Sequence, residues 1–130
     1  MRRTLAPLVL LLLCACGGKA ASPGPRIYVA LDEQFSRPLL DRFAQELKVT
    51  LEQRHDTESN KTVGFVSMIR EEQHSPRCTV FWNNEIAHTV RLAQLGLLEP
   101  YDPPAARDLP AAWRDQEHRW HGFAARARKR

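Results

Sequence analysis

Three short apolar or partly apolar runs alternate with segments of helical periodicity, and this alternation limits the chain to few folds. Residues 27–31 are continuously apolar over the length of a strand, and residues 78–82 are apolar except at Thr79. Residues 49–51, continued by Gln53 and His55, predict another short strand between them. Uninterrupted apolar runs are typical of parallel strands that are covered on both faces. The sequence therefore predicts an α/β fold, in which a parallel sheet centred on residues 27–31 has helices on both faces.

Helical periodicity follows each predicted strand. In the first such segment an apolar stripe recurs every four residues, at Phe35, Leu39, Phe43 and Leu47. Residues 36–48 are therefore predicted to form an amphipathic helix, with Pro38 in its first turn, where proline is tolerated. Residues 61–73 keep helical spacing and predict a second helix. A third helix is predicted to start after Asn83, a natural cap, and to stop at Gly96.

The rest of the chain is predicted to be mostly irregular. Residues 103–113 are rich in proline and alanine, which indicates a loop with one short helical turn after Pro110. Residues 120–128 indicate a last extended segment.

The N-terminus predicts export. Arg2 and Arg3 precede the apolar residues 8–13, and the run ends in the letters LCAC at residues 13–16. A positive start, about ten apolar residues and small residues at the cleavage site are typical of a secretory signal peptide. The ending in Leu-x-Ala-Cys is typical of a bacterial lipoprotein.

These features predict how the chain is divided. We expect residues 1–15 to be removed as a lipoprotein signal peptide and Cys16 to carry the lipid. Residues 16–25, rich in glycine and proline, form a flexible tether, and residues 26–130 form one small α/β lobe. The protein is then periplasmic or at the cell surface, anchored by lipid to a bacterial membrane. The alternative is a plain secretory signal, cut near Ala20 or Ala21.

Charge gives no indication of a nucleic-acid partner. The chain has 19 basic and 15 acidic residues, but Arg2 and Arg3 leave with the signal, and four basic residues crowd the last five positions. The positive excess therefore comes from the two termini rather than from a basic surface. Cys78 is the one cysteine expected to remain as a free thiol, buried in its strand.

Polar side chains follow each predicted strand, at the edge where ligands of open parallel sheets bind. The candidate ligand-binding residues in these loops are Asp32, Glu33, Thr57, Glu58, Ser59, Asn84 and Glu85. Oxygen donors suit hard cations, and helix starts suit anions, so this edge is predicted to bind a metal with an anion, or a small zwitterion. The alternative is that three residues of these loops only cap helices: Asp32, Ser59 and Asn83.

Five motifs carry a family resemblance. They are IYVALD at residues 27–32, DTESNKTVG at 56–64, VFWNNEI at 80–86, GLLEPY at 96–101 and GFAARAR at 122–128. In this order and spacing they resemble extracellular solute-binding proteins of ABC importers, most of all the ferric-iron-binding branch. The resemblance covers residues 26–128 and implies the N-terminal lobe of a type 2 periplasmic binding protein.

The resemblance also implies which residues bind. In ferric-binding relatives a histidine after the first strand and a glutamate after the third supply iron ligands. Here those places hold Asp32 and Asn84, with Glu85 adjacent. Asp32 and Glu85 are thus the expected metal ligands, and Arg126 resembles a position that helps to hold the synergistic anion. The expected ligand is Fe³⁺ with such an anion, or a small anionic solute, as cargo rather than as a resident cofactor.

The expected function follows from the same family. Relatives pair this lobe with a second one of similar size, which supplies two tyrosine ligands, and the 130 residues hold no such lobe. Because these receptors close two lobes on their ligand, we expect an incomplete, truncated lobe to bind weakly or to have lost binding. The chain is thus expected to be a monomeric substrate-binding lipoprotein, not an enzyme, whose partner is an importer permease.

Two other functions fit parts of the sequence. A zinc-dependent enzyme would use His118 and His121 as metal ligands. Further ligands would come from among His74, His88 and Cys78. Two histidines three apart converge on a helical turn, whereas residues 120–123 are predicted to be extended, which argues against this site. A small membrane-anchored interaction protein would instead use its arginine-rich end on anionic lipid or on a partner surface.

Overall fold

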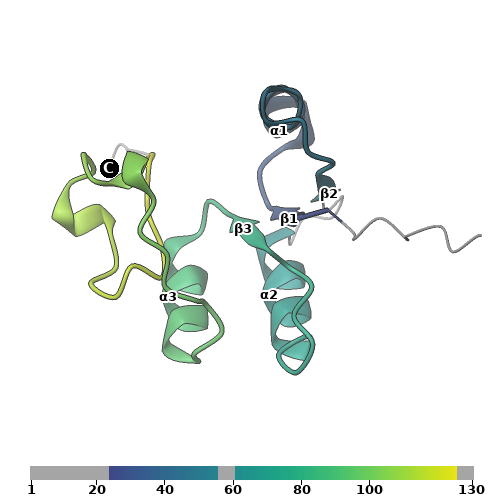
Figure 1. Ribbon diagram of the computed structural model, residues 1–130. Helices are drawn as coiled ribbons and strands as arrows, with labels where there is room; N and C mark the ends of the chain where they lie inside the picture. The colour runs from purple at the N-terminus through teal and green to yellow at the C-terminus, as the bar shows by residue number, and fades with distance from the viewer. Residues whose placement is uncertain (1–23, 56–60, 126–130) are drawn as a thin grey trace, which may run out of the picture.

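The computed structural model describes residues 24–55 and 61–125. Strands and helices alternate along the chain, as the sequence predicts (Figure 1). The main elements are β1 (Arg26–Val29), α1 (Glu33–Leu47), β2 (Glu52–His55), α2 (Lys61–Glu71), β3 (Val80–Trp82) and α3 (Ile86–Gln94). Two short 3-10 helices follow, at Pro104–Ala106 and Ala111–Trp113.

The three strands form one parallel sheet in the order β2-β1-β3. Ile27 of β1 pairs with Gln53 on one side and with Val80 on the other. The predicted α/β class, the parallel sheet and the central position of the first strand are thus confirmed. β1 is the most buried of the three strands, because it has a neighbour at each edge and helices over each face.

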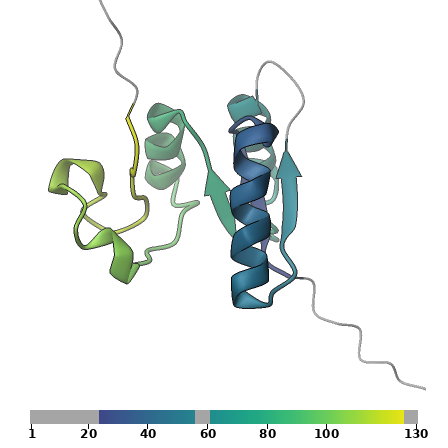
Figure 2. The ribbon, with the colours of Figure 1, turned by 90° about the horizontal axis from the view of Figure 1, so that it is seen from above.

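Helices cover both faces of the sheet, as predicted. α1 lies against one face, and α2 and α3 lie on the other (Figures 1 and 2). Successive side chains of a strand point to opposite faces, so β1 contributes to two cores. Ile27 and Val29 pack with Leu40 of α1, whereas Tyr28 and Ala30 pack on the side of α2 and α3.

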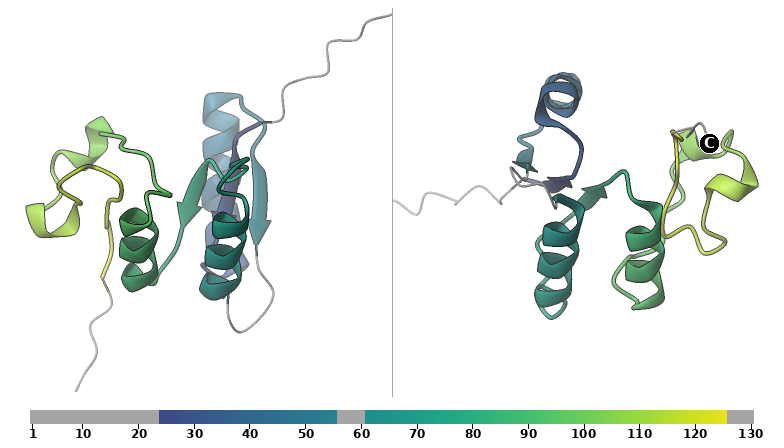
Figure 3. Two further views of the ribbon diagram at one scale, coloured as in Figure 1. Left: turned by 90° about the horizontal axis from the view of Figure 1, so that it is seen from below. Right: turned by 180° about the vertical axis from the view of Figure 1, so that it is seen from behind.

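The larger core lies between the sheet and the pair α2 and α3, which run side by side (Figure 3). Its buried members are Tyr28, Ala30, Phe65, Val66, Ile69 and Leu92. The rings of Tyr28 and Phe65 stack with their centroids 5.1 Å apart. The Tyr28 hydroxyl donates a hydrogen bond to the Glu72 carboxylate at 2.8 Å, so its polar atom is satisfied. Burial, with this carboxylate nearby, raises the pKa of Tyr28.

The start of α1 differs from the prediction. The helix begins at Glu33, so Pro38 is its sixth residue and lies in the second turn rather than the first. The backbone carbonyl of Asp32 accepts hydrogen bonds from the N–H groups of Phe35 and Ser36. These bonds fix the first turn upstream of the proline, which is why the predicted start at residue 36 is wrong.

The apolar stripe of α1 faces solvent, the reverse of what amphipathic spacing normally indicates. Its four side chains are 48–60 % exposed: Phe35, Leu39, Phe43 and Leu47. The residues of α1 that are buried are Ser36 and Leu40, each one position further along. The Ser36 hydroxyl donates to the carbonyl of Asp32 at 3.1 Å, so burying it leaves no unpaired hydroxyl. Because α1 contacts the sheet on one side only, the row next to its buried residues stays exposed.

Left-handed residues end both α1 and α3. Lys48 has φ 53°, and the N–H that follows it donates to the carbonyl of Ala44 at 3.1 Å. Gly96 has φ 69°, and the N–H that follows it donates to the carbonyl of Leu92 at 3.0 Å. Both ends are Schellman motifs. The predicted glycine cap at Gly96 is confirmed, whereas the same conformation at Lys48 falls on a residue with a Cβ, for which it is unfavourable.

The edge strands are shorter than predicted. β2 begins at Glu52 rather than at residue 49, because the turn at Lys48 intervenes. β3 begins at Val80 rather than at residue 78, and Val80 is half exposed. The predicted burial of the third strand is wrong here, because β3 has a strand on one side only.

Residues 99–125 form an irregular segment beside α3 (Figure 1). The predicted helical turn after Pro110 is confirmed as the 3-10 helix Ala111–Trp113. The predicted extended segment at 120–128 is described only to residue 125. Within that part, Arg114 and His121 form an isolated antiparallel bridge, and no further strand joins the sheet.

The predicted signal peptide at 1–15, the lipidation at Cys16 and most of the tether at 16–25 lie outside the described residues and stay predictions. β1 begins at Arg26, where the sequence predicts the lobe to begin. Of the helices described, none has the length and apolar character needed to cross a membrane.

Candidate functional site

The carboxyl ends of β1 and β3 lie at one edge of the sheet, which we name the strand-end edge. Val29 and Trp82 pair there, and the chain passes from each end into the start of a helix, α1 or α3. Residues 32–33 stand at the first helix start and residues 84–85 at the second. The parallel register thus brings two of the three predicted loops to the same edge.

Asp32 and Glu33 stand at the start of α1. Asp32 is the N-cap and is exposed, and its backbone carbonyl makes the first helical hydrogen bonds. The Glu33 carboxylate accepts a hydrogen bond from Nε of Arg37 at 2.7 Å, one turn along the helix. This ion pair is half exposed, so it contributes little, and Glu33 stays a predicted ligand-binding residue. Asp32 remains the predicted metal ligand of this loop.

Asn83 organises the loop after β3. Its amide oxygen accepts a hydrogen bond from the backbone N–H of Glu85, and its amide nitrogen donates to the hydroxyl of Thr89. The N-cap of α3 is Glu85 rather than the predicted Asn83, whose side chain bonds the N–H of that cap residue and the hydroxyl of Thr89 in the first turn. Asn84 and Glu85 are both exposed at the helix start. Asn83 thus fixes the backbone that presents the two predicted binding residues.

The other predicted ligand residues lie outside the described residues and stay predictions: Thr57, Glu58, Ser59 and Arg126. The chain does approach the strand-end edge shortly before Arg126. The ring centroid of Phe123 lies 6.0 Å from that of Trp82, at the end of β3.

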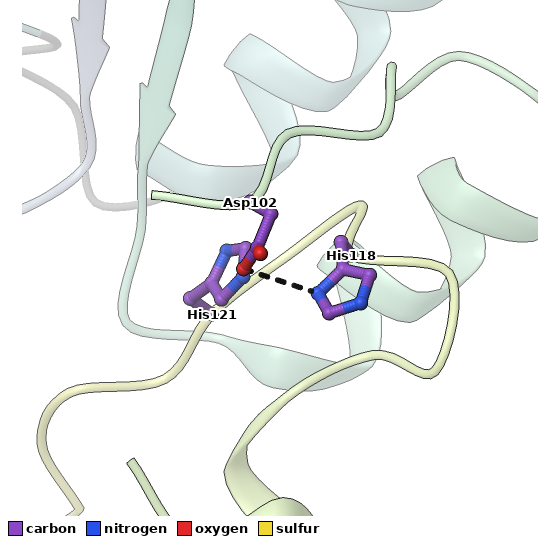
Figure 4. A group of neighbouring side chains, drawn as sticks. All are labelled: Asp102, His118 and His121. Carbon is purple, nitrogen blue, oxygen red and sulfur yellow. Dashed lines mark ion pairs between the residues drawn. The ribbon is translucent and has the colours of Figure 1, made fainter. Parts of the chain in front are cut away.

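A second group of side chains lies in the irregular segment and is named here the His–Asp cluster: Asp102, His118 and His121 (Figure 4). One ligand atom from each lies within 4.8 Å of the others. The two imidazole centroids are 6.2 Å apart, and Nδ1 of His118 is 3.6 Å from Oδ1 of Asp102. Among residues 24–55 and 61–125, no other three His, Cys, Asp or Glu side chains come this close.

The two histidines converge without a helix, contrary to the expectation from the sequence. His118 closes a turn in which its N–H donates to the carbonyl of Asp115 at 3.1 Å, and it has a left-handed φ of 57°. His121 then pairs with Arg114 across the antiparallel bridge. The turn and the bridge fold the chain back on itself, so an extended conformation after His118 does not separate the two rings.

Sequence reasoning missed Asp102. It lies far before His118 in the chain, and no spacing rule joins the two. The backbone N–H of Tyr101 donates to the carbonyl of His118 at 2.9 Å, which sets the next residue, Asp102, beside the imidazole. Its position depends on a tertiary backbone contact, for which the sequence carries no signal.

One arginine fixes the loop that carries the histidines. Nε of Arg119 donates to the Asp115 carboxylate at 2.6 Å, and this hydrogen bond lowers the pKa of Asp115 and raises the pKa of Arg119. The same guanidinium donates to the carbonyl of Ala93 at 3.2 Å, near the end of α3. The loop is thereby attached to a regular helix.

The further zinc ligands considered from the sequence lie outside the cluster: His74, His88 and Cys78. Cys78 packs at the margin of the larger core, and its thiol donates to the carbonyl of Val80 at 3.3 Å. Burial raises the pKa of this thiol to about 11. A thiol that stays protonated at neutral pH is a poor nucleophile and a poor metal ligand.

No known protein family, curated protein or solved structure matches the chain. Its two candidate sites differ in their donor atoms. The strand-end edge offers carboxylate and amide oxygens, whereas the His–Asp cluster offers two imidazole nitrogens and one carboxylate.

Proposed function

We propose that the chain is a solute-binding lobe of an importer receptor, whose ligand binds at the strand-end edge. The observation that carries the proposal is the parallel order β2-β1-β3, because it sets two polar loops and two helix starts at one edge. In open parallel sheets, ligands bind outside the carboxyl ends of the strands. The five motifs that resemble solute-binding proteins support the same assignment, with a type 2 periplasmic-binding-protein lobe as the fold.

The ligand is a hard cation held together with an anion, or a small anionic solute. Asp32, Asn84 and Glu85 are exposed and offer only oxygen donors, which hard cations such as Fe³⁺ prefer. The starts of α1 and α3 favour a negative charge through their backbone N–H groups and dipoles. Asp32 and Glu85 supply the metal ligands of this lobe, and the partner that receives the solute is an importer permease.

Thermal unfolding of the purified protein with ferric citrate tests this function, with citrate alone and phosphate alone as separate probes. We expect ferric citrate in large excess to raise the melting temperature only slightly. A ligand that binds only the folded state stabilises it, but a single lobe supplies only part of the contacts of a closed receptor. The variant with Asp32→Asn and Glu85→Gln should lose this rise. Asp108→Asn, which removes an exposed carboxylate from the irregular segment, is the matched control and should keep it.

The absence of any rise with all three probes would contradict the proposal, as would an equal rise in the double variant. Circular dichroism of each variant without ligand separates lost binding from lost folding. A rise with citrate or phosphate alone would assign the ligand to the anionic class.

We also propose that Cys16 anchors the protein to the outer face of a bacterial membrane. Incorporation of labelled palmitate in cells that express the whole chain tests it. Cys16→Ser should abolish the label and release the protein from the membrane fraction, whereas Cys14→Ser, two positions earlier, should change neither. Absence of the label from the parent protein would favour the plain secretory signal, and equal labelling of the two variants would show that Cys16 is not the lipidated residue.

A further inference from the structure

The His–Asp cluster is not part of the proposed solute site. Each of its two histidines has a buried ring nitrogen, although the segment that carries them is largely exposed. Nδ1 of His118 and Nε2 of His121 are buried, and neither has a hydrogen-bond partner among the residues that the structure describes. Buried polar atoms nearly always have a polar partner, so two ring nitrogens without one beside the same carboxylate are suited to bind an ion. The carboxylate of Asp102 faces the same space (Figure 4).

The spacing of the cluster fits ligands of one metal better than it fits hydrogen bonds. Nδ1 of His118 is 3.6 Å from Oδ1 of Asp102, beyond the usual range of a hydrogen bond. Two ligand atoms bound at ~2.0–2.1 Å to a tetrahedral metal are themselves ~3.3 Å apart. The atoms from all three side chains already lie within 4.8 Å of one another, so small side-chain rotations bring them to that distance.

The backbone prepares this arrangement before any metal is bound. The bridge to Arg114 holds His121, the turn from Asp115 holds His118, and the N–H of Tyr101 ties the chain before Asp102 to that turn. This backbone holds Nδ1 of His118 and Nε2 of His121 in buried positions. Ligands on a preset backbone lose less conformational freedom on binding.

We propose that Asp102, His118 and His121 bind a divalent transition-metal ion of the zinc class. Imidazole nitrogen suits zinc and its first-row neighbours, whereas Mg²⁺ and Ca²⁺ prefer sites made of oxygen alone. Three protein ligands leave a coordination position for water or for a bound solute, which is the pattern of open rather than structural zinc sites. The side chains of His118 and Asp102 are 43 % and 48 % exposed, so the ion reaches the site from solvent.

The bound metal has a structural consequence for the irregular segment. It joins Asp102, early in the segment, to His121, near the end of its described part. Such a link closes a loop and stabilises the folded segment, because the unfolded chain holds no preformed site.

Calorimetric titration of the whole, metal-free protein with ZnCl₂ tests the site. We expect one zinc ion per chain, together with a rise in the melting temperature. His118→Asn, His121→Asn and Asp102→Asn should each weaken zinc binding by more than about 10-fold, since losing even a second-shell partner has that effect. His74→Asn, an exposed histidine outside the cluster, is the matched control and should bind as the parent does. Titrations in a Cys78→Ser background exclude binding by the thiol.

Two results would overturn the proposal: no zinc binding with a Kd below about 100 µM, or parental zinc affinity in the variant with both His118→Asn and His121→Asn. A measurement on the unchanged protein guards against variants that do not fold. Paramagnetic Co²⁺ should shift NMR signals of residues 101–121 and leave those of α1 in place, and the opposite pattern would refute the site.

The site and the proposed solute function can fail separately. Asp32→Asn with Glu85→Gln should leave zinc binding unchanged, and His121→Asn should leave the ferric citrate response unchanged. Zinc affinity that depends on Asp32 and Glu85 would assign the metal to the strand-end edge instead.

Discussion

The two faces of the sheet are covered very differently, although the same central strand supplies both. On one side, α2 and α3 together bury a core of six residues that includes Phe65 and Leu92. On the other side, α1 alone covers Ile27 and Val29 with one buried leucine, Leu40. The first face has two helices and the second has one.

This difference shows that apolar content does not decide which side chains become buried. α1 carries an apolar stripe of two phenylalanines and two leucines, yet that stripe is exposed while Ser36 is fully buried. α2 buries Phe65, Val66 and Ile69 because the sheet and α3 enclose it from two directions. The number of neighbours around a helix, rather than its own sequence, sets how much of it is covered.

The largest effect is expected on the face of α2 and α3. Phe65→Ala removes a ring that is 2 % exposed and stacks on Tyr28, so unfolding should become easier by about 3–5 kcal/mol. Urea denaturation measures this change. Val63→Ala on the same helix removes a side chain that is half exposed, and it should cost less than about 1 kcal/mol. Similar losses of unfolding free energy in the two variants would contradict the conclusion that burial between the sheet and α3 makes Phe65 important.

The face of α1 should show the same contrast at a smaller scale. Leu40→Ala should cost about 2–3 kcal/mol, near the low end for a core leucine, because the cluster around it is small. Leu39→Ala lies on the exposed stripe and should change the unfolding free energy by about 0.5 kcal/mol or less. Urea midpoints compare the two. A loss for Leu39→Ala as large as that for Leu40→Ala would mean that the stripe is covered in solution.

Alkaline pH should weaken the larger core through Cys78. Burial raises the pKa of the folded-state thiol from 9.0 to about 11, so the folded state keeps a proton that the unfolded state loses. The stabilisation is therefore complete below pH 9 and is lost as the pH rises towards 11, an effect on the order of 1 kcal/mol. Urea midpoints at pH 8, 9.5 and 11 measure it against Cys78→Ala, whose decline should be shallower. Parallel curves would show that the thiol is not desolvated by the core.

The smallest effect concerns the ends of the helices. Lys48→Gly should stabilise the protein by about 0.5–1 kcal/mol, because glycine adopts the left-handed conformation that ends α1 without steric cost. Gly96→Ala at the end of α3 should destabilise it by about 1 kcal/mol, since that residue has φ 69°. Thermal unfolding distinguishes the signs. Changes of the same sign would show that the two ends are not equivalent Schellman motifs.

The fold was largely predictable because strand and helix leave different periods in the sequence. The run 27–31, which contains Tyr28, is apolar at every position, as a strand covered on both faces requires, and its strand is the centre of the sheet. The start of α1 was not predictable from Pro38, since tolerance of proline in the first turn does not forbid it in the second. Periodicity could not predict which face of α1 meets the sheet either. The exposed face with Phe35 and Leu39 and the buried face with Ser36 and Leu40 are only one residue apart along the helix.

The candidate sites divide in the same way. The loops at Asp32 and Asn84 followed from strand order alone, because parallel strands share the edge at which they end. The His–Asp cluster depends on the positive φ of His118 and on a backbone bond from Tyr101, neither of which a local pattern records. The sequence indicated His118 and His121 as a possible ligand pair by their spacing, but it did not indicate Asp102 as the third member of the group.

The central position of β1 has a consequence for how the protein is made. Arg26 pairs with Glu52 of β2, and its N–H also bonds the hydroxyl of Thr79, which lies 53 residues further along the chain. A ribosome that synthesises the chain therefore completes β1 before it completes either neighbouring strand. Pairing between distant segments waits for the intervening chain to close into a loop, so completion of the sheet is timed by the emergence of β3. The most protected strand of the finished protein is thus the one left longest without its partners during translation.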